Sequence, residues 1–327
     1  MVAEVEISAA HWVGFIAVVL VLLSLDLGVF HRKAHVVKFR EALAWTTVWF
    51  TLSVLFSGAL VKLRGEEEAV EFLTGYIIEL SLSMDNVFVI ALIFAYFRVP
   101  LEYQHRVLFW GIMGALIMRG LMIGLGAALI NRFDWLLQVL GVFLILTGIK
   151  MIFAGDHAPQ PEKNLLIRLA RRFFPVSPGF DGQKFITRIA GRSTLTPLAL
   201  VLLMVETTDL IFAVDSIPAI FAVTQKPFIV FTSNVCAILG LRSLYFVLAG
   251  AIGYFRYLKV GLSLVLSFIG VKMLIRMWHV EIPTPTSLAI VAAIILTSIA
   301  FSIVVARRDG STPGSASDTG MPGPKTG

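Results

Sequence analysis

Apolar runs of about 20 residues recur along this 327-residue chain and constrain its fold more than any other feature. A helix of roughly that length crosses the hydrocarbon core of a bilayer. Hydrophobic residues make up 57% of the chain, above the roughly 45–50% apolar content of soluble domains. The predicted fold class is therefore all-α, a polytopic helical membrane protein. The runs predict about nine spans, at roughly 12–30, 42–62, 70–97, 106–130, 134–154, 196–222, 228–252, 257–277 and 285–306.

Lysine and arginine gather in alternate connections between these spans. With nine spans, 18 lie on one side of the membrane and four on the other. Because basic loops are retained in the cytoplasm, we expect the N-terminus outside, with the 155–195 loop and the C-terminus cytoplasmic. Since the charge follows loop sidedness, the net charge of +6 indicates no nucleic-acid partner, and membrane lipid is the expected surrounding. Residues 1–306 are predicted as one transmembrane domain, followed by a disordered Gly/Ser/Pro-rich tail at 307–327.

An internal repeat is visible inside the membrane domain. Three pairs of short segments match at offsets of 124, 123 and 122 residues, and they are 83–88 with 207–212, 118–120 with 241–243, and 147–151 with 269–273. Each unit, about 70–154 and about 196–277, holds three helices, so the second must enter from the opposite side. This predicts a 3+3 inverted-topology repeat, an architecture that places a transporter's site near mid-membrane between the repeats.

Two acidic segments lie within the apolar runs. One belongs to the third span and the other to the sixth. An ionised side chain at mid-helix costs about 2.5–3.5 kcal/mol, so five such carboxylates are expected to hold or pass an ion. The five are Glu79, Asp85, Glu206, Asp209 and Asp215. Because Asp85 and Asp209 are repeat mates on opposed helices, we expect their side chains to converge on one cation.

The other donors near these acids are also hard oxygens. Asn86 follows Asp85, and Pro218 cannot donate to the carbonyl of Val214, which predicts a kink and a released oxygen there. Such ligands suit Mg, Ca or Mn. No bound cofactor is expected beyond a transported divalent cation. Three further polar residues carry less weight as members of the ion path, namely Asp26, Asn234 and Ser216.

A structural interpretation of the acids stays open. Arg119 and Arg242 are repeat mates within spans four and seven and could serve as charge partners of the buried aspartates. Five carboxylates facing two arginines leave a surplus of about three negative charges, which favours a cation or protonation. Lys150 and Lys272 lie near span ends, and we expect them to snorkel to the interface.

The long loop contains a basic segment with aromatic neighbours. Arg168, Arg171 and Arg172 precede Phe173 and Phe174. The segment could form an amphipathic helix on anionic lipid, but an ordinary basic cytoplasmic loop is the favoured interpretation.

Signatures of enzymes are absent from the sequence. It has no phosphate-binding loop, no His-Glu-x-x-His and no nucleophile elbow, so we predict that the chain is not an enzyme. An intramembrane aspartyl hydrolase stays a remote alternative because its Gly-x-Gly-Asp sequence is missing. A single cysteine excludes a disulfide framework. With no ATP-binding motif, protons or the membrane potential would drive transport.

Four segments closely resemble the TerC/Alx family of bacterial and plastid membrane proteins, and they are 25–32, 81–88, 105–111 and 208–219. The resemblance implies a multi-pass protein of the bacterial cytoplasmic (inner) membrane, related to LysE-like exporters. It also implies efflux of metal ions, most of all Mn²⁺, along the acidic motifs, and a link to tellurium resistance. One departure is Leu80, where the family commonly has a basic residue after the glutamate.

Two functions of different classes follow. The first is a secondary transporter that exports Mn²⁺ and exchanges protons at its carboxylates. The second is a membrane scaffold for an envelope-stress or tellurite-resistance complex, in which the acids are structural partners of the arginines.

Overall fold

The computed structural model describes residues 8–25, 39–133, 135–153, 164–189, 191–249, 258–278, 280 and 282–308. Within these ranges the chain is almost entirely helical. Its elements are α1 (Ala9–Leu25), α2 (Phe39–Arg64), α3 (Glu66–Tyr96), α4 (Leu101–Arg132), α5 (Trp135–Phe153), α6 (Leu165–Phe173), β1 (Ile186–Ile189), β2 (Arg192–Leu195), α7 (Pro197–Phe221), α8 (Pro227–Ala249), α9 (Leu258–Ile275), the 3₁₀ turn η4 (Arg276–Trp278) and α10 (Thr284–Arg308).

Eight of these helices are long and apolar enough to cross a membrane. They begin and end within a few residues of the predicted spans, and the shorter apolar helix α1 falls in the first predicted span. The prediction of a polytopic helical membrane protein is therefore confirmed. Asp26 and the predicted disordered tail from residue 309 lie outside the described residues.

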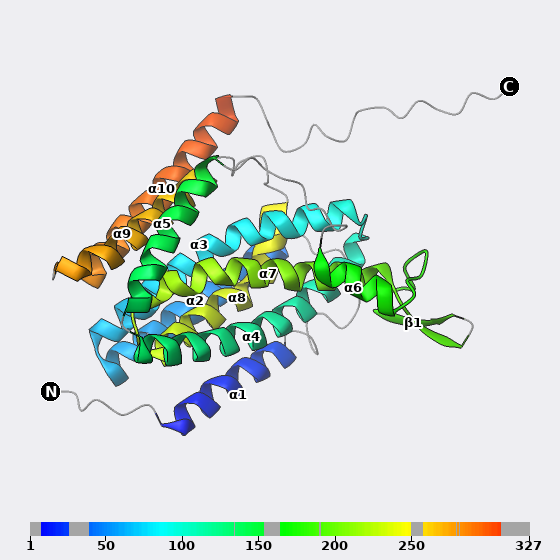
Figure 1. The fold of residues 1–327 in the computed structure, drawn as a ribbon, viewed down its shortest axis with the longest axis horizontal. Helices are drawn as coiled ribbons and strands as arrows, with labels where there is room; N and C mark the ends of the chain where they lie inside the picture. Colours follow the sequence, from blue (N-terminus) through cyan, green and yellow to red (C-terminus); the bar gives the residue numbers. More distant parts are fainter. Residues whose placement is uncertain are drawn as a thin grey trace.

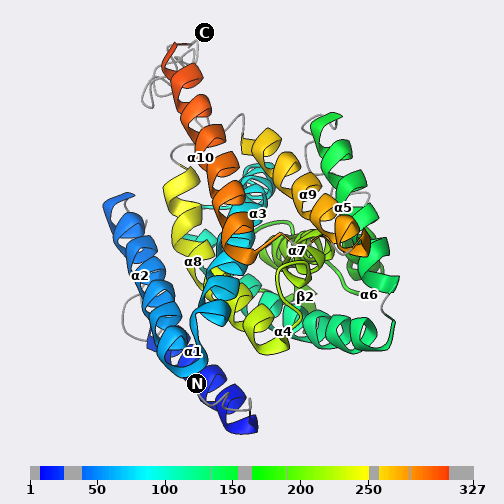
Figure 2. The same ribbon diagram turned by 90° about the vertical axis from the view of Figure 1, so that its left-hand side faces the viewer.

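The long helices pack as one bundle with α3 and α7 at its centre (Figures 1 and 2). Helices α5, α9 and α10 lie together on one flank, whereas α1 and α2 lie on the other (Figure 2). Contacts between elements join α3 to α7, α4 to α8 and α5 to α9. These are the pairs of repeat mates, and a twofold relation between two three-helix units would bring such mates together.

Glycines allow α5 and α9 to approach closely. A Cβ atom on Gly270 would lie 2.6 Å from the carbonyl oxygen of Gly141, and one on Gly148 would lie 2.5 Å from Ser267 Oγ. Small residues at such contacts let helix backbones pack tightly inside a membrane. Gly148 and Gly270 are repeat mates, so both halves use the same device at the same contact.

Helix α7 carries two prolines without losing continuity. Pro197 occupies the first turn, where its missing N–H leaves no hydrogen bond unmade. Pro218 stands near the C-terminal end, where the helix continues to Phe221 and the N–H of Ala222 donates to the Pro218 carbonyl. The helix is therefore continuous past Val214, and the expected release of the Val214 carbonyl, which follows from the missing N–H of Pro218, stays a prediction.

The connection between α5 and α7 is partly ordered. Asn164 caps α6 by accepting hydrogen bonds from the N–H groups of Leu166 and Ile167, at 2.9 and 3.2 Å. A short antiparallel hairpin follows, in which Gly191 supplies a positive φ of 78° between β1 and β2. The favoured prediction of an ordinary loop was wrong for 165–173, because a polar cap and a one-sided apolar pattern stabilise a helix there.

Candidate ion site

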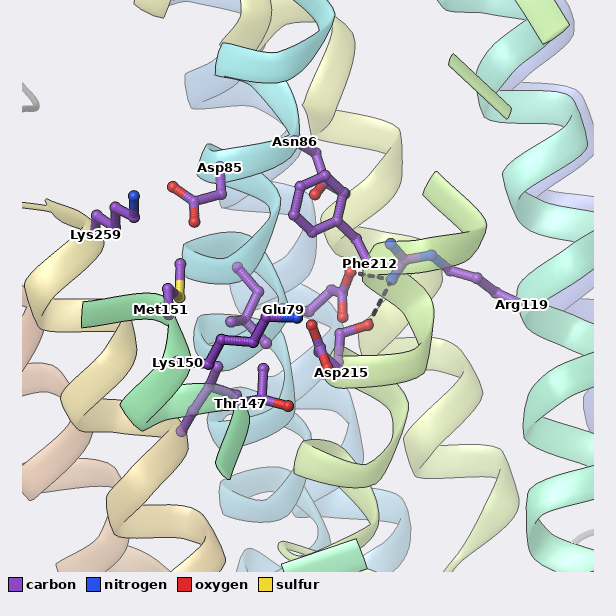
Figure 3. A pocket seen from close by; sticks show the side chains of 13 residues that line it. Glu79, Asp85, Asn86, Arg119, Thr147, Lys150, Met151, Phe212, Asp215 and Lys259 are labelled. Atoms are coloured by element: carbon purple, nitrogen blue, oxygen red, sulfur yellow. Dashed lines mark hydrogen bonds and ion pairs between the residues drawn. The ribbon is translucent and has the colours of Figure 1, made fainter. Parts of the chain in front are cut away.

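A cavity of about 260 Å³ lies between α3, α5, α7 and α9, in the core of the bundle. Figure 3 shows its side chains, with a buried arginine on one side and two lysines on the other. Its polar and charged lining consists of Glu79, Asp85, Asn86, Arg119, Thr147, Lys150, Asp215, Ser216 and Lys259. Residues of both repeats therefore meet here, as expected for a site between inverted repeats.

Arg119 joins two of the predicted acids. Its guanidinium forms an ion pair with Glu79, and Nη2 donates to Oδ1 of Asp209 at 3.1 Å. Arg119 is only 1% exposed and Glu79 is fully buried. The pairing ties α3, α4 and α7 together, and each buried charge is met by an opposite one, as a low-dielectric interior requires.

Polar neighbours complete this network. Arg119 Nη1 donates to Asn234 Oδ1 at 2.7 Å and to Ser216 Oγ at 3.3 Å. Asn86 Nδ2 donates to Oδ1 of Asp209 at 3.2 Å. The structure therefore brings the less heavily weighted residues Ser216 and Asn234 into contact with the main acidic groups through one arginine.

Two oxygens of the lining side chains have no hydrogen-bond partner among the described residues. They are Oε2 of Glu79 and Oδ1 of Asn86, and both are buried. A buried acceptor left unsatisfied costs about 1–3 kcal/mol, and more for a charged group. Acceptors held this way beside a cavity are suited to receiving a water molecule or a cation.

Asp215 and Asp85 supply the remaining carboxylates of the cavity. Asp215 accepts a hydrogen bond from Thr147 and lies close enough to Lys150 for an electrostatic attraction. Lys150 points into the cavity, and Lys259 stands nearer to Asp85 (Figure 3). The expectation that Lys150 snorkels away to the interface was wrong, because an aspartate within reach attracts the ammonium inward.

Other predicted residues lie apart from this cavity. Asp209 faces Arg119 and lines a much smaller pocket of about 20 Å³ together with Arg242. Arg242 itself contacts His105, at 3.1 Å between Nη1 and Nε2. Glu206 packs against Gly114 of α4. Asp85 and Asp209 therefore do not line this cavity together.

No preassembled metal cage exists in the described part of the chain. No three side chains of His, Cys, Asp or Glu are grouped closely enough there to hold a metal ion. A cation in the cavity would therefore take its ligands from two carboxylates, the free Glu79 and Asn86 oxygens and its own water.

A second cavity, of about 660 Å³, lies at the opposite end of the bundle. It is lined by the start of α3, the end of α7 and the end of α9, including Lys272 and Met273. Lys272 and Met273 are the repeat mates of Lys150 and Met151, which line the first cavity. An apolar cluster that includes Leu82 and Leu266, both also in the first cavity's lining, continues to Met273 in the second.

A cluster of ion pairs joins α2, α3 and the α7–α8 connection beside this second cavity. Lys226, between α7 and α8, lies 3.4 Å from Glu68 and 3.3 Å from Glu71, and Arg64 also binds Glu68 at 2.7 Å. Burial disfavours the charged form of Lys226, but the carboxylates of Glu71 and Glu68 outweigh it and raise its pKa above the ordinary value of 10.5. The cluster fastens α2 and α3 to the α7–α8 connection.

Sequence reasoning missed three polar members of the first cavity, Thr147, Lys150 and Lys259. The repeat did contain a signal for two of them, since Thr147 and Lys150 lie in a matched segment whose counterpart carries Lys272. Lys259 has Leu137 as its mate at the same offset of 122 residues, so the repeat gave no comparable signal for it.

Comparison with known proteins places the chain among bacterial membrane proteins. An uncharacterized membrane protein of Myxococcus xanthus, STKORF319, is 53% identical over 92% of this chain and 94% of its own length. A protein of Escherichia coli K12 described as "Putative membrane-bound redox modulator Alx" is 47% identical over 87% of this chain and 91% of its own length. An uncharacterized membrane protein of Rickettsia bellii is 40% identical over 90% of this chain and 97% of its own length. No solved structure matches.

The family comparison covers all of the helices that build the two cavities. The model of the integral membrane protein TerC family matches residues 64–310, which is most of the chain. The resemblance seen in the sequence motifs is therefore confirmed. This chain belongs to the TerC family of integral membrane proteins.

Proposed function

We propose that this protein is a secondary transporter that exports a divalent cation, Mn²⁺ in preference, through the cavity between its two repeats. One observation carries the proposal. Glu79 Oε2 and Asn86 Oδ1 are buried and have no partner in the described part of the chain, and their side chains line the cavity with Asp85 and Asp215. Ionisable groups inside a membrane bundle mark ion pathways by default.

The charge balance supports a cation that enters and leaves. Four carboxylates line the cavity or belong to its network, and three fixed cations oppose them, which leaves one net negative charge. Arrival of a divalent ion would reverse this to one net positive charge. Release of one proton from a lysine ammonium, to the side from which the metal enters, would restore neutrality. Rebinding of a proton from the other side after the metal leaves would couple metal export to proton entry.

Donor chemistry favours Mn²⁺ over Mg²⁺. Carboxylate and amide oxygens suit both ions, but a thioether prefers the softer metal. Met151 lines the cavity, whereas Met84 packs in the apolar core and Met204 accepts a hydrogen bond from Asn164. The sulfur nearest the proposed path therefore belongs to Met151.

Two cavities at opposite ends of the bundle support alternating access. The first extends toward the end where α5 finishes and α9 begins, and the second lies at the start of α3. In inverted-repeat transporters, one half rocks against the other and exchanges the roles of the two sides. The repeat-related lysines, Lys150 and Lys272, would then take equivalent places in the two states.

Transport by purified protein in liposomes tests the proposal. Uptake of Mn²⁺, Mg²⁺, Ca²⁺, Zn²⁺ and Fe²⁺ at two pH values would be measured for the native protein, Asp85→Asn and Asp215→Asn. The exposed Asp181→Asn supplies a matched control outside the cavity. We expect the two cavity variants to lose at least tenfold in Mn²⁺ flux with unchanged folded yield. Flux no greater than that of protein-free liposomes would reject the transport assignment, and equal flux in all four proteins would reject this cavity as the path.

A second candidate is a membrane scaffold, and the Arg119 network favours it. Glu79 and Asp209 are both paired with a buried arginine, which is what structural acids require. Under this alternative, cavity variants would lower the folded yield, and neither they nor the native protein would transport ions. Deletion of the connection between α5 and α7 would then be the more harmful change in cells.

The Escherichia coli relative is described as a redox modulator, but this chain has few residues that could carry out thiol redox chemistry. The sequence has one cysteine, so the protein cannot form an internal dithiol couple. Cys236 lies beside an apolar cluster that contains Phe72 and Phe228. Redox modulation by cysteines of this chain is therefore not favoured as a mechanism.

A further inference from the structure

Helix α6 presents three distinct faces. Ile167 is 1% exposed and packs into the core among residues of α3, α4, α7 and α8. On a second face, Leu165 and Phe173 are each 69% exposed, with Leu169 between them at 46%. At 100° per residue, Arg168, Arg171 and Arg172 occupy the remaining third of the helix surface.

The helix lies at the edge of the spanning bundle. Asn164 Nδ2, at its N-terminus, contacts Met204 Sδ at 3.3 Å. Met204 is the eighth residue of α7, which places that contact about 10 Å inside the end of a spanning helix. Figure 1 shows α6 against the first turns of α7, in line with the end of the bundle. The exposed apolar face therefore lies beside the end of a spanning helix, where we expect the boundary between acyl chains and headgroups.

The arginines of α6 have no anionic partner among the described residues. Arg168, Arg171 and Arg172 are all exposed, and none of their guanidinium groups forms an ion pair or hydrogen bond with the described part of the protein. Three guanidiniums beside an exposed apolar face complement a surface that is apolar below and negatively charged above. A bilayer leaflet containing anionic phospholipid has that chemistry.

We propose that α6 is an interfacial anchor that binds anionic phospholipid. Its apolar face, defined by Leu165, Leu169 and Phe173, enters the acyl region, and its arginines hold phosphate groups. Guanidinium pairs with phosphate in bidentate geometry, so lipids that carry net negative charge are selected over zwitterionic ones. The anchor would fix the α5–α7 connection against the membrane at the end toward which the first cavity extends.

Fluorescence quenching by brominated lipids tests this proposal on the full-length protein in liposomes. A bimane label is placed at Leu169→Cys in a Cys236→Ser background. Liposomes contain equal mole fractions of phosphatidylcholine and phosphatidylglycerol, with bromine on the acyl chains of one or the other. We expect brominated phosphatidylglycerol to be enriched at the label about fivefold or more, since each basic residue near such a surface contributes about that factor.

Controls separate the anchor from general contact with lipid. A label at Leu121→Cys, on the exposed surface of α4, should be quenched equally by both lipids. Replacing the three arginines by glutamine should abolish the preference at Leu169→Cys, whereas Lys62→Gln at the other end of the bundle should keep it. Equal quenching by both lipids in the native background would overturn the proposal, as would a label quenched by neither lipid. Labelled protein that remains monodisperse after extraction shows that the variants fold.

Discussion

Arg119 Nη2 and Asp209 Oδ1 lie 3.1 Å apart and join α4 to α7 across 90 residues of sequence. The same guanidinium also binds Glu79 of α3. The charge of Arg119 therefore compensates two carboxylates at membrane depth. An ion in the neighbouring cavity meets these two acids already paired through one oxygen or more, so Asp85, Asp215 and the second carboxylate oxygen of Glu79 are left to respond to it.

Replacing Arg119 should destabilise the folded protein and not only lower its rate of transport. Arg119→Gln leaves Glu79 and Asp209 buried without a cation, and breaking such a pair costs about 3–5 kcal/mol. We expect the folded yield in detergent to fall sharply, as measured by fluorescence-detected size-exclusion chromatography. Adding Glu79→Gln and Asp209→Asn removes the orphaned charges and should restore most of the yield. Failure of this triple variant to recover would mean that Arg119 acts through packing.

Lys150 should set the affinity of the cavity for metal. Its ammonium attracts Asp215 and competes with any cation that binds there. Lys150→Gln removes one positive charge and should tighten binding of Mn²⁺ by about tenfold, the effect of a nearby charge in a partly buried site. Isothermal titration of the purified protein measures the affinity. Lys62→Gln, at the other end of the bundle, is the matched control, and a similar gain there would assign the effect to overall charge.

Hydropathy and charge were sufficient to locate the spans, because crossing a bilayer demands long apolar helices and constrains little else. The internal repeat likewise identified α5 and α9 as mates, and Gly148 and Gly270 each allow a close approach to the facing helix of this pair. Neither pattern could show which acid faces which cation. The partner of each acid depends on how its helix is rotated about its own axis. A rotation of 100°, one residue, decides whether the Asp209 side chain faces Arg119 or the cavity. The inward direction of Lys150 was missed for the same reason, since snorkelling assumes a side chain that faces lipid.

The contribution of the Lys226 ion pairs to the stability of the fold should be lost at strongly alkaline pH. The raised pKa of Lys226 means that its stabilising contribution is complete below about pH 10.5, the ordinary value, and is lost as the pH rises through the folded-state pKa. Thermal unfolding of the native protein and Lys226→Gln should differ at pH 8 and converge at strongly alkaline pH. Because the Lys226 side chain is 38% exposed, the difference should stay below about 1 kcal/mol. A gap that widens with pH would contradict the assigned partners.

The contact between α5 and α9 should tolerate no added methyl group. Gly270→Ala would place Cβ 2.6 Å from a backbone oxygen of Gly141, and a backbone atom cannot move aside as a flexible side chain can. Overpacking of this kind costs about 1–3 kcal/mol, so the melting temperature of the detergent-solubilised protein should fall. Gly124→Ala on α4 is the control, because a Cβ there meets nothing within 4 Å, and alanine favours the helix by about 0.5–1 kcal/mol. If both variants melt alike, the two halves are not held together by the close approach of α5 and α9.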